Sequence, residues 1–280
     1  MILVTTAGKV GSEAARLLTQ REIPVRVLVR DREKAKALAD AGAEIAVGDL
    51  AVPASIDEAM AGVTSVVLVS PAVPAQELNV VASAARAGVG HIVKATSKAS
   101  ADSPIARRRW QTEIEAGLAA SGVPHTLLRS NAYMHNVLAL VPAIAKTSGF
   151  GSSAGKGGIG MIDARDVATV AASIAASPGP HAGKTYWLTG PALISYYDVA
   201  AVLSQLLGRI ITYRELTFDQ DKDTMIRAGV PEQIAEMNAQ AASLTADGDA
   251  AWVTDDVPSL LGRPARSFKE FATDYANAFS

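Results

Sequence analysis

Short runs of apolar residues, many of them β-branched, recur along the first half of the chain and alternate with segments of helical spacing. Six runs are almost continuously apolar, as is typical of parallel strands buried on both faces: 2–5, 25–29, 43–47, 65–69, 91–95 and 125–129. The segments between them predict helices over 11–20, 31–42, 74–88 and 111–122. Strict alternation indicates an α/β fold, a doubly wound parallel sheet with right-handed crossovers.

The regular alternation loosens after about residue 130. Segment 147–160, TSGFGSSAGKGGIG, is rich in glycine and predicts a mobile surface loop, which leaves open whether it closes as a lid. A helix over 163–177, a strand over 184–190 and a serine-capped helix over 195–208 follow, and the tail from Phe218 is mostly helical. We expect this smaller C-terminal part to pack over the carboxyl edge of the sheet, where ligands bind in such folds.

The segment TTAGKVG, Thr5–Gly11, joins the first strand to the first helix. Aligned without gaps, it matches a G-x-x-G-x-x-G pattern whose amides and helix N-terminus receive a pyrophosphate. Gly8 would let the backbone approach the phosphates, and Gly11 would let helix and strand pack closely. Thr5 replaces the first glycine, and its β-branched side chain is expected to restrict the turn and lower the affinity. An ordinary strand-to-helix turn is the alternative.

Residues after the second and third strands predict contacts with the adenosine half of a dinucleotide. Arg30 stands where an acidic residue binds the ribose 2′-hydroxyl and an arginine suits a 2′-phosphate, whereas Asp31 suits a helix cap. Asp49 could accept from the adenine amino group while Leu50 covers the ring. We therefore expect a Rossmann-type NAD(P)-binding domain over 1–150 and an interleaved, substrate-side region over 151–280. The expected cofactor is NADP(H), with NAD(H) as the alternative.

Composition narrows the remaining possibilities. The net charge of −2 shows no basic balance for nucleic acid, and the absence of cysteine excludes disulfides and thiolate metal sites. Four histidines without HExxH spacing argue against zinc, so no metal is expected. No apolar run is long enough to span a membrane and the start carries no charged leader, so a cytoplasmic protein without a membrane partner is expected. The segment GSSAG, 151–155, matches a hydrolase nucleophile pattern only by chance composition.

Several blocks resemble, in order, the NmrA-like branch of the atypical short-chain dehydrogenases/reductases. They include VLVRD, GDL, SGVPHTLLRSNAYMHN, DARDVATVAA, GKTYWLTGP and GRPARSFKEFATDYA, and together they cover nearly the whole chain. The type resembled is the NAD(P)H-dependent quinone oxidoreductase and triphenylmethane reductase type. Two departures lie on the cofactor path: the family's Thr-Gly-Ala-Thr-Gly loop reads VTTAG here, and its Arg-Pro after the sixth strand reads Arg129-Ser130.

The resemblance implies that VSPAV, 69–73, and ATS, 95–97, line the nicotinamide ribose and ring. With the residues above, the expected cofactor-binding set is Thr5, Thr6, Gly8, Lys9, Val10, Gly11, Arg30, Asp49, Leu50, Val69, Ser70, Pro71, Ala95, Thr96, Ser97 and Asn131. The segment NAYMHN, with Tyr133, would form a wall on the acceptor side. The alternative for Tyr133 is a packed aromatic side chain.

The chain lacks a suitably placed Tyr-x-x-x-Lys, the proton-donor motif of typical short-chain dehydrogenases. Relatives often carry histidine or lysine where Gln111 stands, with a glutamate four residues on, as Glu115 is here. Gln111 can orient a ribose or a substrate carbonyl but cannot titrate. The alternative for Gln111 is an exposed helical side chain without a role.

Without a proton donor, the reaction most easily supported is hydride transfer to an electron-poor acceptor. We expect an NAD(P)H-dependent reductase of a quinone-like or polycyclic aromatic small molecule, acting as a monomer or homodimer, with natural-product tailoring as a narrower version. The missing motif leaves open a non-catalytic NADP(H)-binding redox sensor of the NmrA type that regulates a partner protein.

Overall fold

The computed structural model describes residues 1–279 and divides the chain into two compact units. Unit one comprises 1–103, 107–130 and 164–187, and unit two comprises 104–106, 131–163 and 188–280. Both units are therefore discontinuous in sequence. This division differs from a single boundary at residue 150, because segment 164–187 returns to complete the helical layer and the sheet of unit one.

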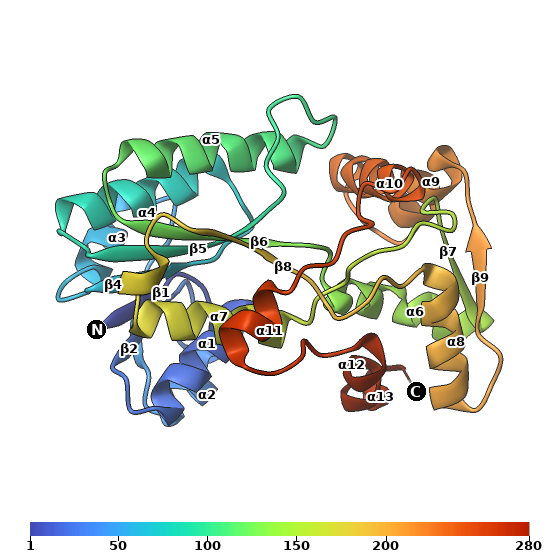
Figure 1. Ribbon diagram of the computed structural model, residues 1–280, viewed down its shortest axis with the longest axis horizontal. Helices are drawn as coiled ribbons and strands as arrows, with labels where there is room; N and C mark the ends of the chain where they lie inside the picture. The colour runs from blue at the N-terminus through green and yellow to red at the C-terminus, as the bar shows by residue number, and fades with distance from the viewer. Residues whose placement is uncertain (280) are drawn as a thin grey trace. The chain divides into compact units, whose positions relative to one another are not determined.

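Unit one contains the seven-stranded sheet, in the order β3-β2-β1-β4-β5-β6-β8 (Figure 1). The strands are β1 Ile2–Val4, β2 Val25–Val29, β3 Glu44–Val47, β4 Ser65–Leu68, β5 His91–Ser97, β6 His125–Ser130 and β8 Thr185–Leu188. Every pair from β3 to β6 is parallel. The Leu127 amide donates to the Lys184 carbonyl, and farther along both strands the Asn131 amide donates to the Leu188 carbonyl. Because residue numbers rise in the same direction along the two strands, β8 is parallel to β6 as well. The predicted doubly wound sheet is confirmed.

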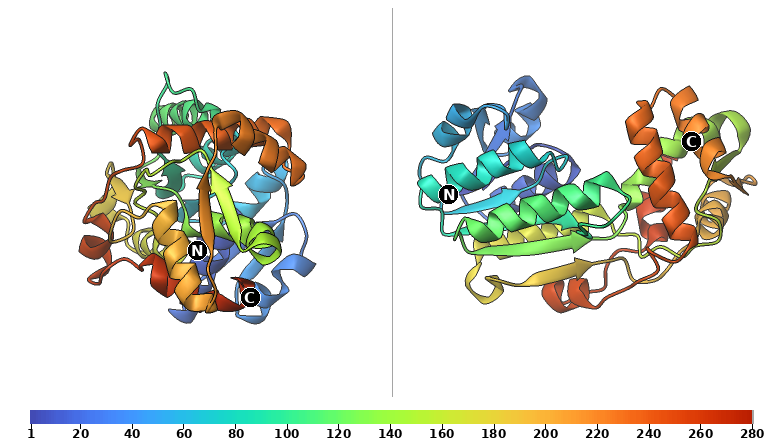
Figure 2. Two further views of the ribbon diagram at one scale, coloured as in Figure 1. Left: turned by 90° about the vertical axis from the view of Figure 1, so that its right-hand side faces the viewer. Right: turned by 90° about the horizontal axis from the view of Figure 1, so that it is seen from above.

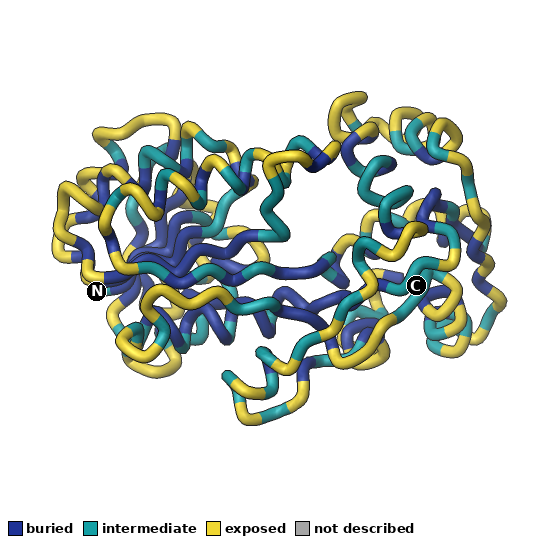
Figure 3. The backbone as a smooth tube through the Cα atoms, turned by 45° about the horizontal axis from the view of Figure 1, so that its top comes forward, coloured by how far each residue is buried: buried dark blue, intermediate teal, exposed yellow. Residues whose placement is uncertain are grey.

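Helices cover both faces of this sheet (Figures 1 and 2). One face carries α1 Lys9–Gln20, α2 Lys36–Asp40 with the preceding turn η1 Glu33–Ala35, and α7 Ala164–Ala176; the other carries α3 Pro53–Ala59, α4 Pro74–Arg86 and α5 Ala106–Ala120. The sequence pattern missed α3, which is short and opens on proline. Apolar side chains from α3, α4 and the central strands form one core, and the strands appear in Figure 3 as its buried layer.

Unit two is mostly helical around a two-stranded parallel sheet. Its elements are η2 Met134–Leu140, α6 Val141–Thr147, β7 Gly149–Ser152, α8 Tyr196–Leu207, β9 Thr212–Glu215, α9 Phe218–Arg227, α10 Glu232–Ala246, α11 Asp256–Leu261, α12 Phe268–Asp274 and α13 Ala276–Phe279, while η3 Gly179–His181 belongs to unit one. The predicted serine cap of α8 is confirmed, since Ser195 and Asp198 form a capping box. Among residues 1–279, no helix has the length and apolarity needed to cross a membrane, and no cluster of acidic and histidine side chains is arranged to hold a metal.

The prediction of a mobile surface loop over 147–160 is wrong. The segment forms β7 and then a buried turn, whose Ser152 hydroxyl and Ser153 amide and hydroxyl all donate to the Asp221 carboxylate at 2.7–3.1 Å. Its glycines permit close backbone contacts: a Cβ at Gly157 would lie 2.0 Å from the Thr245 carbonyl oxygen, and one at Gly160 would lie 2.2 Å from that of Trp252. The glycine content therefore reflects tight packing.

We predict that Asp221→Ala strongly destabilises unit two, because three buried donors lose their acceptor. The expected loss in the free energy of unfolding is about 2–4 kcal/mol, measured by urea denaturation. Asp223→Ala, which removes an exposed carboxylate from the same helix, is the matched control and should change stability by less than about 0.5 kcal/mol. Equal effects of the two substitutions would contradict the packed turn.

Candidate functional site

The sheet changes direction between β1 and β4. The chain winds outward from β1 through β2 and β3, and then returns to place β4, β5 and β6 on the other side. In open parallel sheets, ligands bind at the carboxyl edge beside such a switch point, because the two flanking loops lead away from each other. The loops after β1 and β4, the first turn of α1 and the last residues of β5 lie at this edge, and together they contain most of the predicted cofactor contacts.

The structure changes the alignment of the loop after β1 with the glycine pattern of dinucleotide-binding folds. The Thr5 amide donates to the Val67 carbonyl at 3.1 Å, so Thr5 still continues the pairing of β1 with β4. The loop therefore begins at Thr6, and Thr6-x-Gly8-x-x-Gly11 has the spacing of the dinucleotide fingerprint G-x-G-x-x-G. Gly11 has the predicted packing role: a Cβ there would lie 1.9 Å from the Thr6 carbonyl oxygen. A side chain at this position would push α1 away from the loop.

The expectation that the Thr5 side chain restricts the turn is wrong. The Thr5 hydroxyl donates to the Val69 carbonyl at 2.8 Å and accepts from the Val69 amide at 2.9 Å. The Thr6 hydroxyl donates to the same carbonyl at 3.0 Å. Neither threonine has a positive φ, so the turn does not require glycine at either position. The two side chains join the end of β1 to the end of β4.

The N-terminus of α1 fits a pyrophosphate. Helix geometry leaves the amides of Lys9, Val10 and Gly11 without an intrahelical acceptor, and Gly8, the N-cap, supplies no side-chain acceptor. Lys9 places a positive charge at the positive end of the helix dipole, where only an anion compensates it. Among the described residues, a Cβ at Gly8 would come near the Thr6 hydroxyl alone, at 3.8 Å. The space in front of Gly8 is thus available to a ligand.

A surface hollow of about 310 Å³ lies at the ends of β2 and β3 and is lined by Arg30, Val47, Gly48, Asp49, Val52 and Ser55. Arg30 is exposed and makes no hydrogen bond with the described part of the chain. Val47 and Val52 are each about half exposed, which leaves two apolar side chains for the faces of a base. Leu50 is only 6 % exposed and packs in the core, and its contact with the adenine stays a prediction.

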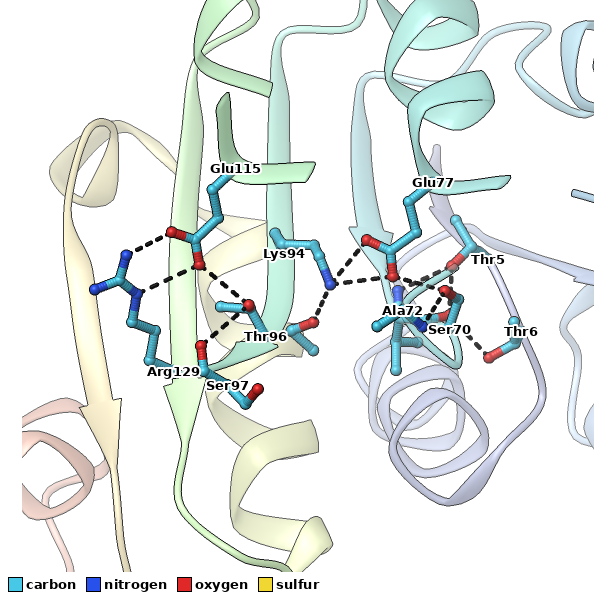
Figure 4. A network of polar contacts seen from close by, with 12 residues as sticks. Thr5, Thr6, Ser70, Ala72, Glu77, Lys94, Thr96, Ser97, Glu115 and Arg129 are labelled. Carbon is cyan, nitrogen blue, oxygen red and sulfur yellow. Dashed lines mark hydrogen bonds and ion pairs between the residues drawn. The ribbon is translucent and has the colours of Figure 1, made fainter. Parts of the chain in front are cut away.

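A buried carboxylate supports the loop after β4 (Figure 4). Glu77, in the first turn of α4, forms an ion pair with Lys94 of β5 at 2.9 Å, and both side chains are fully buried. The Ser70 hydroxyl donates to Glu77 at 2.6 Å. Our sequence reasoning missed this pair. The available signal was the charged residue inside the otherwise apolar run HIVKA.

A second carboxylate, Glu115 of α5, lies beside the ends of β5 and β6. It accepts from the Thr96 hydroxyl at 3.1 Å and from the Arg129 guanidinium at 2.5 Å. That guanidinium also lies 5.0 Å from the centre of the Trp187 ring. One helical turn before Glu115, Gln111 is only 4 % exposed, and its side-chain oxygen has no hydrogen-bond partner among residues 1–279. The alternative of an exposed helical glutamine is therefore wrong, whereas the role of Gln111 stays a prediction.

The histidines of unit one lie at the opposite end of the strands. His91 and His125 are the first residues of β5 and β6, and His181 precedes β8. Burial lowers the pKa of His91 to about 4, so its ring is neutral near neutral pH. None of the three histidines of unit one therefore lies at the carboxyl edge, where a general acid would be needed.

Asn131 and Tyr133 belong to unit two. The Asn131 amide group donates to the Ala250 carbonyl at 3.0 Å and its oxygen accepts from the Ala132 amide at 2.7 Å, so its carboxamide already has partners within this unit. Tyr133 is half-buried and pairs through its backbone with Ile162. The cofactor role of Asn131 and the acceptor-side role of Tyr133 stay predictions.

Comparison with known proteins agrees with this geometry. The chain is 38% identical over 283 residues to an NAD(P)H azoreductase of Xenophilus azovorans, covering 100% of this chain and 99% of the relative. The NADPH-dependent quinone oxidoreductase QOR2 of Escherichia coli, complexed with NADPH, superposes with a TM-score of 0.90 at 29% identity, covering 99% and 100% of the two chains. The Citrobacter triphenylmethane reductase complexed with NADP(H) gives 0.88 at 28% identity, with the same coverage. The model of the NmrA-like family matches residues 1–272, and the chain belongs to that family.

Proposed function

We propose that this protein is an NADPH-dependent reductase that transfers hydride to a quinone-like or polycyclic aromatic small molecule. The observation that carries the proposal is the open space at Gly8, in front of uncapped amides at the N-terminus of α1 and beside the switch point of the sheet. Three reductases of related function match nearly the whole chain, which supports the same chemistry here.

Three groups of residues bind the three parts of the dinucleotide: the pyrophosphate, the adenosine half and the nicotinamide half. The amides of Lys9–Gly11 and the Lys9 ammonium bind the pyrophosphate, and Arg30 binds the 2′-phosphate through its planar guanidinium. Val47 and Val52 flank the adenine. The backbone of Val69–Pro71 and of Ala95–Ser97 borders the nicotinamide half. When bound, NADPH supplies the hydride.

The protein residues on the nicotinamide side orient the reactants and do not exchange protons. Gln111 presents a buried amide oxygen that can accept from a ribose or substrate hydroxyl, but an amide does not titrate. This suits an acceptor that is already electron-poor, since the hydride then needs little acid assistance and water supplies the proton. In unit two, Asn131 is proposed as a cofactor contact and Tyr133 as a contact on the acceptor side.

The central test is oxidation of NADPH in the presence of a panel of quinones, azo dyes and triphenylmethane dyes. We expect turnover with at least one acceptor. Gly8→Val should raise the NADPH Kd about 100-fold or more by calorimetry, because its side chain fills the phosphate space. Gly179→Val, at an exposed position where a Cβ meets no described atom within 4 Å, is the control. Tight NADPH binding without turnover of any acceptor would instead favour the redox sensor.

Arg30→Ala tests the choice between the two nicotinamide cofactors. Loss of a charged hydrogen-bond donor should raise the Kd of NADPH about 10- to 100-fold and leave that of NADH unchanged. Lys34→Ala removes a neighbouring exposed cation outside the hollow and should change neither Kd. An unchanged ratio of the two dissociation constants in Arg30→Ala would place the 2′-phosphate elsewhere.

Gln111→Leu should separate stability from activity. Replacing a buried, unpartnered amide by an apolar side chain of similar size should leave the free energy of unfolding unchanged or raise it by up to about 1 kcal/mol. If the amide oxygen binds a ribose or acceptor hydroxyl, kcat/KM should fall about 10-fold. Thermal denaturation and steady-state kinetics measure the two effects, and full activity of Gln111→Leu would remove Gln111 from the site.

A further inference from the structure

The ion pair between Glu77 and Lys94 is expensive to bury. Both side chains are 0 % exposed, and each charge loses its hydration on folding. Apolar residues of similar volume often give equal or greater stability at such a position. Stability alone therefore does not account for this pair, and its contacts indicate what else it does.

Contacts run from Glu77 to the loop after β4. Glu77 accepts from the Ser70 hydroxyl at 2.6 Å, and the Ser70 oxygen in turn accepts from the Ala72 amide at 3.1 Å. Ala72 has a φ of 63°, a left-handed conformation that a residue with a Cβ rarely adopts. The carboxylate thus holds Val69–Val73 in a conformation that the loop would not favour alone.

Contacts run from Lys94 to the end of β5. Its ammonium donates to the Ala95 carbonyl as well as to Glu77. Residues Ala95–Ser97 and the loop after β4 are the two segments assigned above to the nicotinamide half. One buried pair therefore fixes both segments (Figure 4).

We propose that Glu77 and Lys94 are positioning residues for the nicotinamide half of the cofactor, an inference that rests on the proposed function. They act through Ser70 and the Ala95 carbonyl and do not touch the cofactor. The adenosine half is proposed to bind at Arg30 and α1, and within the described part of the chain neither Glu77 nor Lys94 hydrogen-bonds to Arg30 or α1. The inference therefore predicts a loss of affinity confined to one half of the dinucleotide.

The test compares two ligands, NADPH and adenosine 2′,5′-bisphosphate, which lacks the nicotinamide half. The double variant Glu77→Leu/Lys94→Met removes both charges together, so no unpaired buried charge remains. We expect its Kd for NADPH to rise about 10-fold while its Kd for the bisphosphate stays unchanged. The kcat should fall as well, because hydride transfer depends on precise placement. The control Asp57→Asn/Arg86→Met removes a half-exposed pair from α3 and α4 and should alter neither Kd.

The ligand pair separates the possible outcomes. Equal weakening of both ligands in the double variant would show a general structural defect and overturn the inference, as would unchanged binding of both. Ser70→Ala keeps the charges paired and removes only their link to the loop, so it should give the same selective loss of NADPH affinity even where the double variant fails to fold. If the unaltered protein binds neither ligand, the proposed function itself is wrong.

Discussion

The hydrogen bonds between the Thr5 hydroxyl and both backbone groups of Val69 hold β1 to β4 at the point where the sheet changes direction. A dinucleotide site at a switch point needs its two flanking loops to separate without the strand ends separating too. Regular β pairing ends here, because the next residues leave in opposite directions. A threonine side chain replaces the missing backbone partners, and Thr6 adds a second donor to the same carbonyl. The loop after β1 can then turn directly into α1.

Farther along the same edge of the sheet, charged side chains hold the strand ends and loops in place. Glu77 and Glu115 project from neighbouring helices toward β5, where one meets Lys94 and the other meets Thr96. Lys94 and Thr96 are two residues apart and so face the same side of the sheet. The two carboxylates thus form a polar layer beneath the segments proposed to border the nicotinamide half. Directional bonds restrict these loops more than apolar packing does, at a cost in desolvation.

Periodicity predicted a parallel sheet, the alternation of strands and helices along the chain and most of the helices of unit one, because parallel strands buried on both faces form distinct apolar runs. It failed where a residue's role depends on distant partners. In the sequence, Thr5 stands where the glycine pattern expects its first glycine. Its role becomes clear only from the structure, where its hydroxyl donates to the carbonyl of Val69, 64 positions away. From the sequence alone, the glycines of 147–160 indicate a flexible loop. In the structure, the carbonyl oxygens of Thr245 and Trp252 lie so close to two of these glycines that a Cβ would not fit. In the candidate site, Arg30 and Gly8 followed from local pattern, whereas Glu77 and Lys94 did not, since neither belongs to a motif.

Three features at the carboxyl edge of unit one conflict with ordinary folding preferences. Lys9 lies at the positive end of a helix dipole, Ala72 has a left-handed backbone, and the buried side-chain oxygen of Gln111 has no hydrogen-bond partner among residues 1–279. Such conflicts concentrate where function requires them. An anion at α1 would compensate Lys9, and a hydroxyl donor would satisfy Gln111. A dinucleotide supplies both, one from its pyrophosphate and the other from a ribose, so a single ligand would relieve conflicts on two different elements.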